Sequence, residues 1–246
     1  MIEARHVRSL LLDIEGTTTP ISFVYDTLFP YAANNVEEFL SDHLQDEAVQ
    51  RDVRALRSQR EIDLKRGMDA PTCSEQSEQQ QIESVVSYAR WLISRDSKFG
   101  PLKSLQGKVW EEGYLRGDLR GEVFEEVPRA LERWRGRGLR TYIYSSGSVL
   151  AQRLLFGHSN HGDLAKLLDG FFDTSVGPKT EPKSYLRIAE TIALEPSGIV
   201  FLSDAVKELD AARDAGFQTV LSVRPGNQPV ATDEHPRIHN FDDLPL

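Results

Sequence analysis

The sequence has little of what marks secreted, membrane-bound and disulfide-stabilised proteins. Its 246 residues contain one cysteine, Cys73, which cannot form an internal disulfide and lies in a polar stretch, so we expect it to be a bystander thiol. No apolar run approaches membrane-spanning length, and Arg5, His6 and Arg8 precede a short strand without the pattern of a signal peptide. These features predict a cytoplasmic protein without a membrane partner.

Positive net charge, metal-ligand histidine spacing and a nucleotide-binding glycine motif are also missing. The formal net charge is -9, which argues against generic binding to nucleic acids or anionic membranes. His158 and His161 flank a turn that is more typical of a loop than of a zinc site. No predicted strand is followed by Gly-x-Gly-x-x-Gly, which argues against a dinucleotide-binding oxidoreductase. An anionic ligand would therefore need cationic side chains close to it.

The residues that are present fit a globular α/β protein. Hydrophobic residues make up 39% of the chain and charged residues 27%, which is ordinary for this class. Apolar runs bounded by turn residues alternate with amphipathic segments, which predicts a parallel sheet flanked by helices. The first strand is expected within residues 9–17, where an apolar run ends in acids, and further strands are expected at residues 139–144, 171–175, 198–203 and 218–223. In such a sheet the binding site lies beyond the carboxyl ends of the strands.

A long segment without strand patterns interrupts this alternation. Helical periodicity predicts helices near residues 31–44, 46–66, 81–96 and 102–114, with a loop rich in Gly, Pro, Ser and Gln at 67–81. We therefore expect two domains. Residues 1–19 and 124–246 form the α/β core, and residues 20–123 form an all-helical insertion.

Polar side chains follow three of the predicted strands. Asp13 and Glu15 end the first strand, Ser145 and Ser146 end the second, and Asp204 ends a later one. Buried carboxylates are costly unless a cation or a substrate compensates them, so this placement suggests chemistry. A plain structural role remains open for each: the serines and Asp204 as caps of the helices that follow, and the first acids as part of a turn.

The order and spacing of these residues resemble the first two motifs of the haloacid dehalogenase (HAD)-like hydrolase superfamily. The first motif of that superfamily is DxDx[TV] after a buried strand, which resembles Asp13-Ile-Glu15-Gly-Thr17. The second motif is a Ser or Thr at the end of the next core strand, where Ser145 stands with Ser146 beside it. Glu15 departs from the Asp that most phosphatases of the superfamily carry at this position.

The third and fourth motifs are matched further along the chain. Lys179 precedes Pro182 in a run similar to KPxPE, which makes Lys183 the weaker candidate, although a solvated surface role for Lys179 stays open. Asp204 and Glu208 resemble the acids of the fourth motif. Glu208 lies one helical turn beyond Asp204, where it could reach a metal-bound water or Ser203, or form a surface salt bridge.

Within the superfamily, the chain resembles the enolase-phosphatases (acireductone synthases) of methionine salvage. The similarity extends over nearly the whole sequence and includes the insertion. The sequence segments that carry the similarity most specifically are DIEGTTTPISFVYDTLFPYA at residues 13–32, LKSLQGKVWEEGY at 102–114, YSSGSVLAQRLLFGHS at 144–159 and VRPGN at 223–227. The resemblance implies a HAD-like Rossmannoid core with a helical cap inserted between the first and second motifs.

The resemblance also implies an activity. Such an enzyme converts 5-methylthio-2,3-dioxopentyl 1-phosphate to the acireductone 1,2-dihydroxy-5-methylthiopent-1-en-3-one and phosphate, first by enolisation and then by dephosphorylation. Asp13 would be the nucleophile and Glu15 the acid and base. One Mg²⁺ per subunit would be held by Asp13, Glu15 and Asp204, and the phosphate by the residues Ser145, Ser146 and Lys179. Glu208 would support the metal site, and the protein would be a monomer.

Several alternatives remain open at this point. The cap residues Lys103, Gln106 and Lys108 could meet the substrate, whereas the i, i+4 spacing of Trp110 and Tyr114 favours packing. The aromatic residues after the first motif could line a pocket for the methylthio group; they are Phe23, Tyr25 and Phe29. The chain could instead be a capped phosphatase for another small phosphate ester, or a non-catalytic relative that kept the fold as an interaction module.

Overall fold

The computed structural model describes residues 3–72, 77–229 and 234–246. Cys73 lies outside the described residues, so the expectation for its thiol stays a prediction. Backbone contacts divide the chain into two compact units, one formed by residues 1–24 and 120–246 and the other by residues 25–119. Among the described residues, no helix is both long enough and apolar enough to cross a bilayer.

The first unit contains a six-stranded sheet in which every strand is parallel to its neighbours. The strand order is β3-β2-β1-β4-β5-β6, with β1 at the centre. Leu12 of β1 pairs with Ile143 on one side and Leu202 on the other, so these three strands end close together at their carboxyl edge. The strands are β1 (Ser9–Leu12), β2 (Arg140–Tyr144), β3 (Gly170–Phe172), β4 (Ile199–Ser203), β5 (Gln218–Ser222) and β6 (Arg237–Ile238).

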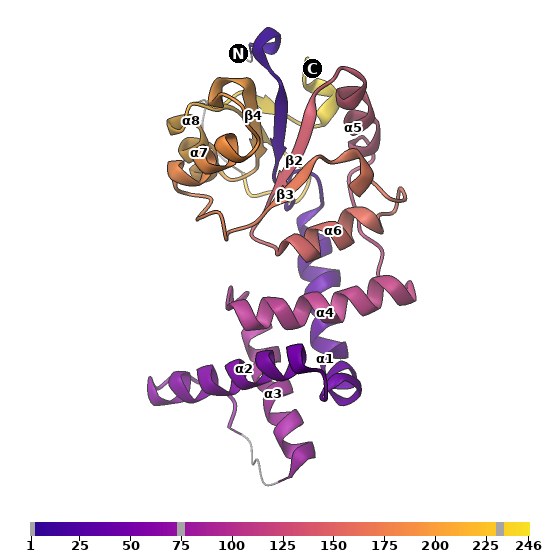
Figure 1. Cartoon of the computed structure of the whole chain (residues 1–246), viewed down its shortest axis with the longest axis vertical. Helices are drawn as coiled ribbons and strands as arrows, with labels where there is room; N and C mark the ends of the chain where they lie inside the picture. The colour runs from indigo at the N-terminus through magenta and orange to yellow at the C-terminus, as the bar shows by residue number, and fades with distance from the viewer. Residues whose placement is uncertain (1–2, 73–76, 230–233) are drawn as a thin grey trace. The chain divides into compact units, whose positions relative to one another are not determined.

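Helices cover both faces of this sheet, as Figure 1 shows, with α7 and α8 on one side and α5 and α6 on the other. Both faces are therefore apolar, and β1 and β4 are buried along their full length, as parallel strands between helices must be. Tyr185 of α7 packs its ring against Phe201 of β4. The helices are α5 (Val127–Gly136), α6 (Val149–Gly157), α7 (Pro182–Thr191) and α8 (Val206–Asp214). Short 3₁₀ helices occupy Ala4–His6, Ala165–Leu167, Pro196–Gly198 and Phe241–Asp243.

The second unit consists of four α-helices, and no strand occurs among its described residues. They are α1 (Phe29–His43), α2 (Glu47–Lys65), α3 (Glu78–Ile93) and α4 (Gly100–Arg116). A π-helix, Phe23–Leu28, leads into α1, in a stretch for which no helix was predicted from the sequence. The indole of Trp110 donates a hydrogen bond to the Leu28 carbonyl at 2.8 Å, which ties α4 to the end of the π-helix.

Packing inside the second unit explains the positions of several residues whose roles the sequence left open. Gln106, Trp110 and Tyr114 of α4 are buried inside the unit, so Trp110 and Tyr114 pack as their spacing predicts. Lys108 forms an ion pair of 2.6 Å with Asp52 of α2, a bond that joins two helices of the same unit. Lys108 therefore helps to hold α4 against α2.

Candidate active site

The turn after β1 presents the side chain of Asp13 at the carboxyl edge of the sheet. The amide of Asp13 still donates to Leu202 of β4, so the strand pairing continues up to this residue. The amides of Thr17, Thr18 and Thr19 then all donate to the Ile14 carbonyl, which closes a tight turn. Gly16 has φ +65°, a left-handed conformation that glycine adopts without strain. The chain reverses here, and the carboxylate of Asp13 stays fixed at the strand end.

Lys179 supplies the cation that the buried carboxylates need. It lies in the loop between β3 and α7, its side chain is 8% exposed, and its ammonium group is 2.7 Å from Asp13 Oδ1 and 2.6 Å from Glu208 Oε2. The hydroxyl of Tyr185 donates to the Lys179 carbonyl at 2.7 Å. Tyr144 donates to the Gly177 carbonyl of the same loop. The lysine is thus held by its backbone as well as by its charge.

Ser203 connects Asp13 to Glu208 on the other side. Its hydroxyl lies 3.2 Å from Asp13 Oδ2 and 3.0 Å from Glu208 Oε2, and it accepts a hydrogen bond from the Ala205 amide. A hydroxyl has one proton, so it can donate to only one of the two carboxylates at a time. With the Ile14 amide on Oδ1, Asp13 has a donor on each carboxylate oxygen, which fixes its orientation.

The crowding of carboxylates perturbs the pKa values of the group. Burial, with the charges of Asp13 and Glu208, raises the pKa of Asp204 to about 7. Burial and the Asp13 charge also raise the pKa of Glu208, although Lys179 acts in the opposite direction. Burial alone would lower the pKa of Lys179, but the two carboxylates outweigh it and raise that pKa. Negative charge therefore exceeds what one lysine neutralises.

The space beside Gly16 fits a cation. A Cβ atom on Gly16 would lie 2.4 Å from Asp204 Oδ2 and 2.7 Å from Asn227 Oδ1, so the absence of a side chain leaves both oxygens room. Among the described residues, no three His, Cys, Asp or Glu side chains are grouped so that they could hold a metal ion by themselves. Mg²⁺ is usually held by one or two carboxylates together with waters and substrate phosphate. Asp13 and Asp204, which follow the paired parallel strands β1 and β4, are the two carboxylates that would supply such ligands.

The structure tests the purely structural roles that the sequence left open for the serines, Asp204 and Lys179. Ser148, rather than Ser145 or Ser146, is the N-cap of α6 and accepts from the Ala151 amide. Ala205 occupies the N-cap position of α8, so the interpretation of Asp204 as a helix cap is wrong. Lys179 is not a solvated surface residue, because it is buried.

The remaining predicted residues lie at the same edge of the sheet. Ser145 is buried, follows β2 directly and accepts a hydrogen bond from the Gly147 amide at 3.1 Å. Ser146 follows it and is half-buried. Glu15 is half-buried in the turn after β1, where its backbone bridges to Thr19. Lys183 is exposed on α7 and stands apart from this group.

Sequence reasoning did not assign a role to Tyr185 or Asn227. Tyr185 belongs to the run of residues that resembles the third motif. The hydrogen bond from its hydroxyl to the Lys179 carbonyl could not be predicted from the sequence. Asn227 belongs to the VRPGN segment, which reads as an ordinary turn after a strand. Its neighbour Gly16 is 211 residues away in the sequence, so only the folded chain brings them together.

The fold and the site define a hydrolase of the HAD type. The family model of the haloacid dehalogenase-like hydrolases matches residues 7–216. The chain is 45% identical to enolase-phosphatase E1 of Danio rerio, covering 98% of this chain and 95% of that protein. It is 46% identical to enolase-phosphatase E1 of Synechococcus elongatus, covering 97% and 98%. The chain therefore belongs to the enolase-phosphatase E1 family of the haloacid dehalogenase-like hydrolases.

Other relatives are longer or are known as structures. The chain spans about half the length of plant relatives such as the probable bifunctional methylthioribulose-1-phosphate dehydratase/enolase-phosphatase E1 1 of Vitis vinifera, at 45% identity over 96% of this chain and 47% of that protein. The crystal structure of the UTR4 protein of Saccharomyces cerevisiae superposes with a TM-score of 0.77 at 35% identity, covering 97% of this chain and 100% of that chain. A HAD phosphatase from Thermococcus onnurineus, at 18% identity and a TM-score of 0.59, shares the fold over 97% and 96% of the two chains.

Proposed function

We propose that the protein is a Mg²⁺-dependent enolase-phosphatase that converts 5-methylthio-2,3-dioxopentyl 1-phosphate to the acireductone and phosphate. The observation that carries the proposal is the carboxylate of Asp13, fixed at a strand end by Lys179 and Ser203. A buried carboxylate with a lysine beside it is suited to attack a phosphorus atom and to form a covalent intermediate. The full-length enolase-phosphatase E1 relatives support the choice of substrate.

Dephosphorylation would proceed in two displacements at phosphorus. An oxygen of Asp13 forms a bond to the phosphorus while the bond to the substrate oxygen breaks, and Glu15 gives that leaving oxygen a proton. Water then attacks the phosphorus of the aspartyl phosphate while Glu15 takes a proton from the water. The bond between Asp13 and phosphorus breaks, phosphate is released, and the free carboxylate of Asp13 is restored. Glu15 lies two residues after Asp13 on the turn, so a single backbone segment positions both groups.

The cationic groups hold the phosphate during these steps. The ammonium of Lys179 offsets the negative charge of the phosphoryl oxygens, and Ser145 and Ser146 offer hydroxyl and amide donors from the loop after β2. Asp13, Glu15 and Asp204 would hold one Mg²⁺. When bound, this ion would neutralise phosphoryl oxygens and let a carboxylate approach a dianion. Ser203 and Glu208 keep Asp13 and Lys179 in place.

Enolisation would precede these steps and requires removal of a proton from the carbon next to a carbonyl. Several carboxylates at the sheet edge are candidates for the base that takes this proton. Deuterium exchange into the substrate by Asp13→Asn separates the two reactions, because phosphate release by that variant should stop. If exchange continues, enolisation does not need the nucleophile; if it stops as well, both reactions depend on Asp13.

The direct test is turnover of the diketone phosphate with and without Mg²⁺. We expect phosphate release together with the absorbance of an enediol, and loss of both when the metal is removed with a chelator. Phosphate release from other small esters without turnover of the diketone would point to a different capped phosphatase. No phosphate release from any of them would favour a non-catalytic interaction protein.

We also propose the organisation of the chain that such an enzyme needs. Residues 20–123 would act as a cap inserted between the first and second motifs, and the protein would be a monomer. Light scattering coupled to size-exclusion chromatography measures the mass directly, and a mass of two chains would contradict the second point.

A further inference from the structure

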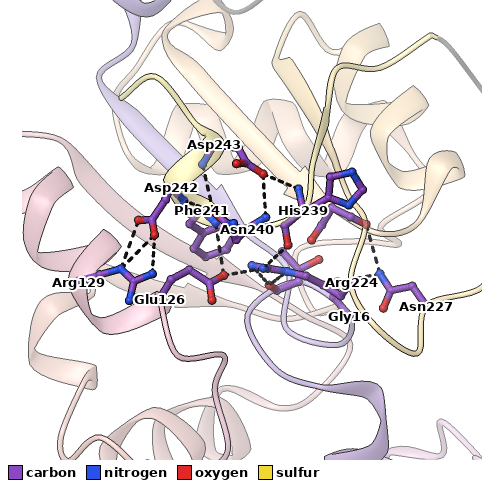
Figure 2. Close-up of polar contacts among 12 residues, drawn as sticks. Gly16, Glu126, Arg129, Arg224, Asn227, His239, Asn240, Phe241, Asp242 and Asp243 are labelled. Carbon is purple, nitrogen blue, oxygen red and sulfur yellow. Dashed lines mark hydrogen bonds and ion pairs between the residues drawn. The ribbon is translucent and has the colours of Figure 1, made fainter.

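The loop after β5 contacts the turn that carries Glu15. We call residues 223–227 the β5 loop. The side chain of Arg224 reaches the backbone carbonyl of Thr17. The side chain of Asn227 reaches the backbone carbonyl of Gly16, as Figure 2 shows. These carbonyls belong to consecutive residues directly after Glu15. The contacts bridge more than two hundred positions of sequence and lie within the first unit.

Asn227 lies closest to the proposed metal site. Its Nδ2 atom donates to the Gly16 carbonyl at 3.0 Å and to the Ser222 carbonyl at 3.2 Å. Its Oδ1 atom is buried without a hydrogen-bond partner among the described residues. That oxygen and Asp204 Oδ2 both lie within 2.7 Å of the position that a Cβ atom on Gly16 would take. Asn227 therefore borders the same space as the carboxylate of Asp204.

Arg224 anchors the other end of the β5 loop. Its Nε and Nη2 atoms donate to the Thr17 carbonyl at 3.2 and 3.0 Å, and its Nη1 atom donates to the His239 carbonyl at 2.7 Å and pairs with Glu126 Oε1 at 2.5 Å. The guanidinium carbon lies 4.5 Å from the ring centroid of Phe124 and 4.8 Å from that of Phe241. Because all three guanidinium nitrogens of this buried arginine have partners, it holds the Thr17 carbonyl in a fixed position.

The turn needs this support because of Gly16. The amides of Gly16 and Thr17 donate within the turn, to the Thr19 and Ile14 carbonyls. A glycine backbone has access to far more conformations than other residues, so contacts to the carbonyls of these residues add a second restraint on the turn. A rotation there would swing Glu15 and alter the space beside Asp204. No amide of the turn donates to the Gly16 and Thr17 carbonyls, which accept hydrogen bonds from Asn227 and Arg224 of the β5 loop.

We propose that Arg224 and Asn227 are positioning residues that clamp the Gly16–Thr17 backbone and so fix Glu15 and Asp204 for metal binding. This inference rests on the proposed metal site at Asp13, Glu15 and Asp204. Neither residue touches the reacting atoms in this account. They act on the metal ligands indirectly, through two backbone carbonyls, in the way that residues surrounding a metal site commonly orient its ligands.

Asn227→Ala, compared with Gln218→Ala, tests the clamp. Gln218 is the first residue of β5, the strand that leads into the β5 loop. Its Nε2 atom also donates to a backbone carbonyl, that of Ser197 at 2.9 Å, but at the opposite end of β5. Mg²⁺ affinity is measured by calorimetry, and thermal unfolding is followed without metal. We expect Asn227→Ala to weaken Mg²⁺ binding about tenfold or more, and Gln218→Ala to leave it unchanged.

The outcomes separate the clamp from the proposed function. Unchanged Mg²⁺ affinity in Asn227→Ala, or equal weakening in both variants, would overturn the clamp. If the wild-type protein itself failed to bind Mg²⁺ or to release phosphate, the proposed function would fall instead. Should Asn227→Ala not fold, Asn227→Ser is measured in the same way, since its short hydroxyl side chain does not reproduce the amide of Asn227.

Discussion

Replacing Gly16 by alanine should disable the site while removing no functional group. The new Cβ atom would lie 2.4 Å from Asp204 Oδ2, whereas ordinary contact begins at 3.4 Å. The carboxylate of Asp204 must therefore move by roughly 1 Å, and a displacement of that size in a catalytic group can lower a rate about 100-fold. The left-handed φ of +65° adds about 1–2 kcal/mol of backbone strain.

Gly138→Ala is the matched control for this variant. Gly138 also has a positive φ, +76°, but nothing lies within 4 Å of its Cβ position, and it is exposed before β2. Both variants should lose a similar amount of thermal stability from strain. Mg²⁺-dependent phosphate release under saturating substrate should fall about 100-fold in Gly16→Ala alone. Full activity in Gly16→Ala would refute the argument that the space beside Gly16 belongs to the site.

Three further predictions concern the charged network. Lys179→Met should lower the rate of phosphate release about 10²–10³-fold, because it removes the ammonium beside Asp13, whereas Lys183→Met should leave it unchanged; equal losses in a steady-state assay would contradict this. Tyr185→Phe should cost about 1–3 kcal/mol of unfolding free energy in denaturant titration, since the Lys179 carbonyl loses a buried donor, and an unchanged midpoint would argue against that bond. Mg²⁺ affinity should fall about tenfold per pH unit below 7, because Asp204 must release a proton to bind the ion, and calorimetry showing no dependence between pH 6 and 8 would exclude this.

The same pKa shift has a consequence for stability without metal. The folded-state pKa of Asp204 is raised to about 7 from an ordinary value of 3.8, so the folded protein holds a proton there that the unfolded chain has lost. Between these two values the contribution of Asp204 to stability falls as the pH rises, and it stays unfavourable above pH 7. Asp204→Asn removes this dependence, which thermal unfolding in chelator at pH 5 and pH 8 can measure.

Most of the core could be predicted from hydrophobic patterning. The expected strands at residues 139–144 and 198–203 are β2 and β4 to within a residue, because runs of this length that are bounded by turn residues and rich in β-branched and aromatic residues favour strands. The strand expected at 171–175 is shorter and ends at Phe172. β6 was missed because two residues, Arg237–Ile238, carry no periodicity. The π-helix at Phe23–Leu28 was missed because an aromatic, turn-rich stretch resembles a loop.

The candidate site was foreseen in its residue types and less so in its contacts. Parallel strands end at one edge, so the meeting of Asp13 with Asp204 followed from the strand order and motif spacing. That Glu208 would share Lys179 with Asp13 could not be deduced, since it depends on the direction of a side chain at the start of α8. The support from Arg224 was also hidden, because a buried arginine looks like any surface arginine in a sequence.

A phosphoryl group on Asp13 is the most direct evidence that this chain works as described. The protein is mixed with Mg²⁺ and the diketone phosphate, stopped in acid during turnover, digested and mapped by mass spectrometry. We predict a transient peptide that contains Asp13 and has gained one phosphoryl group, and we predict that Asp13→Asn does not form it. Steady phosphate release by the wild-type protein with no modified peptide at any time, or with the group on another residue, would contradict it.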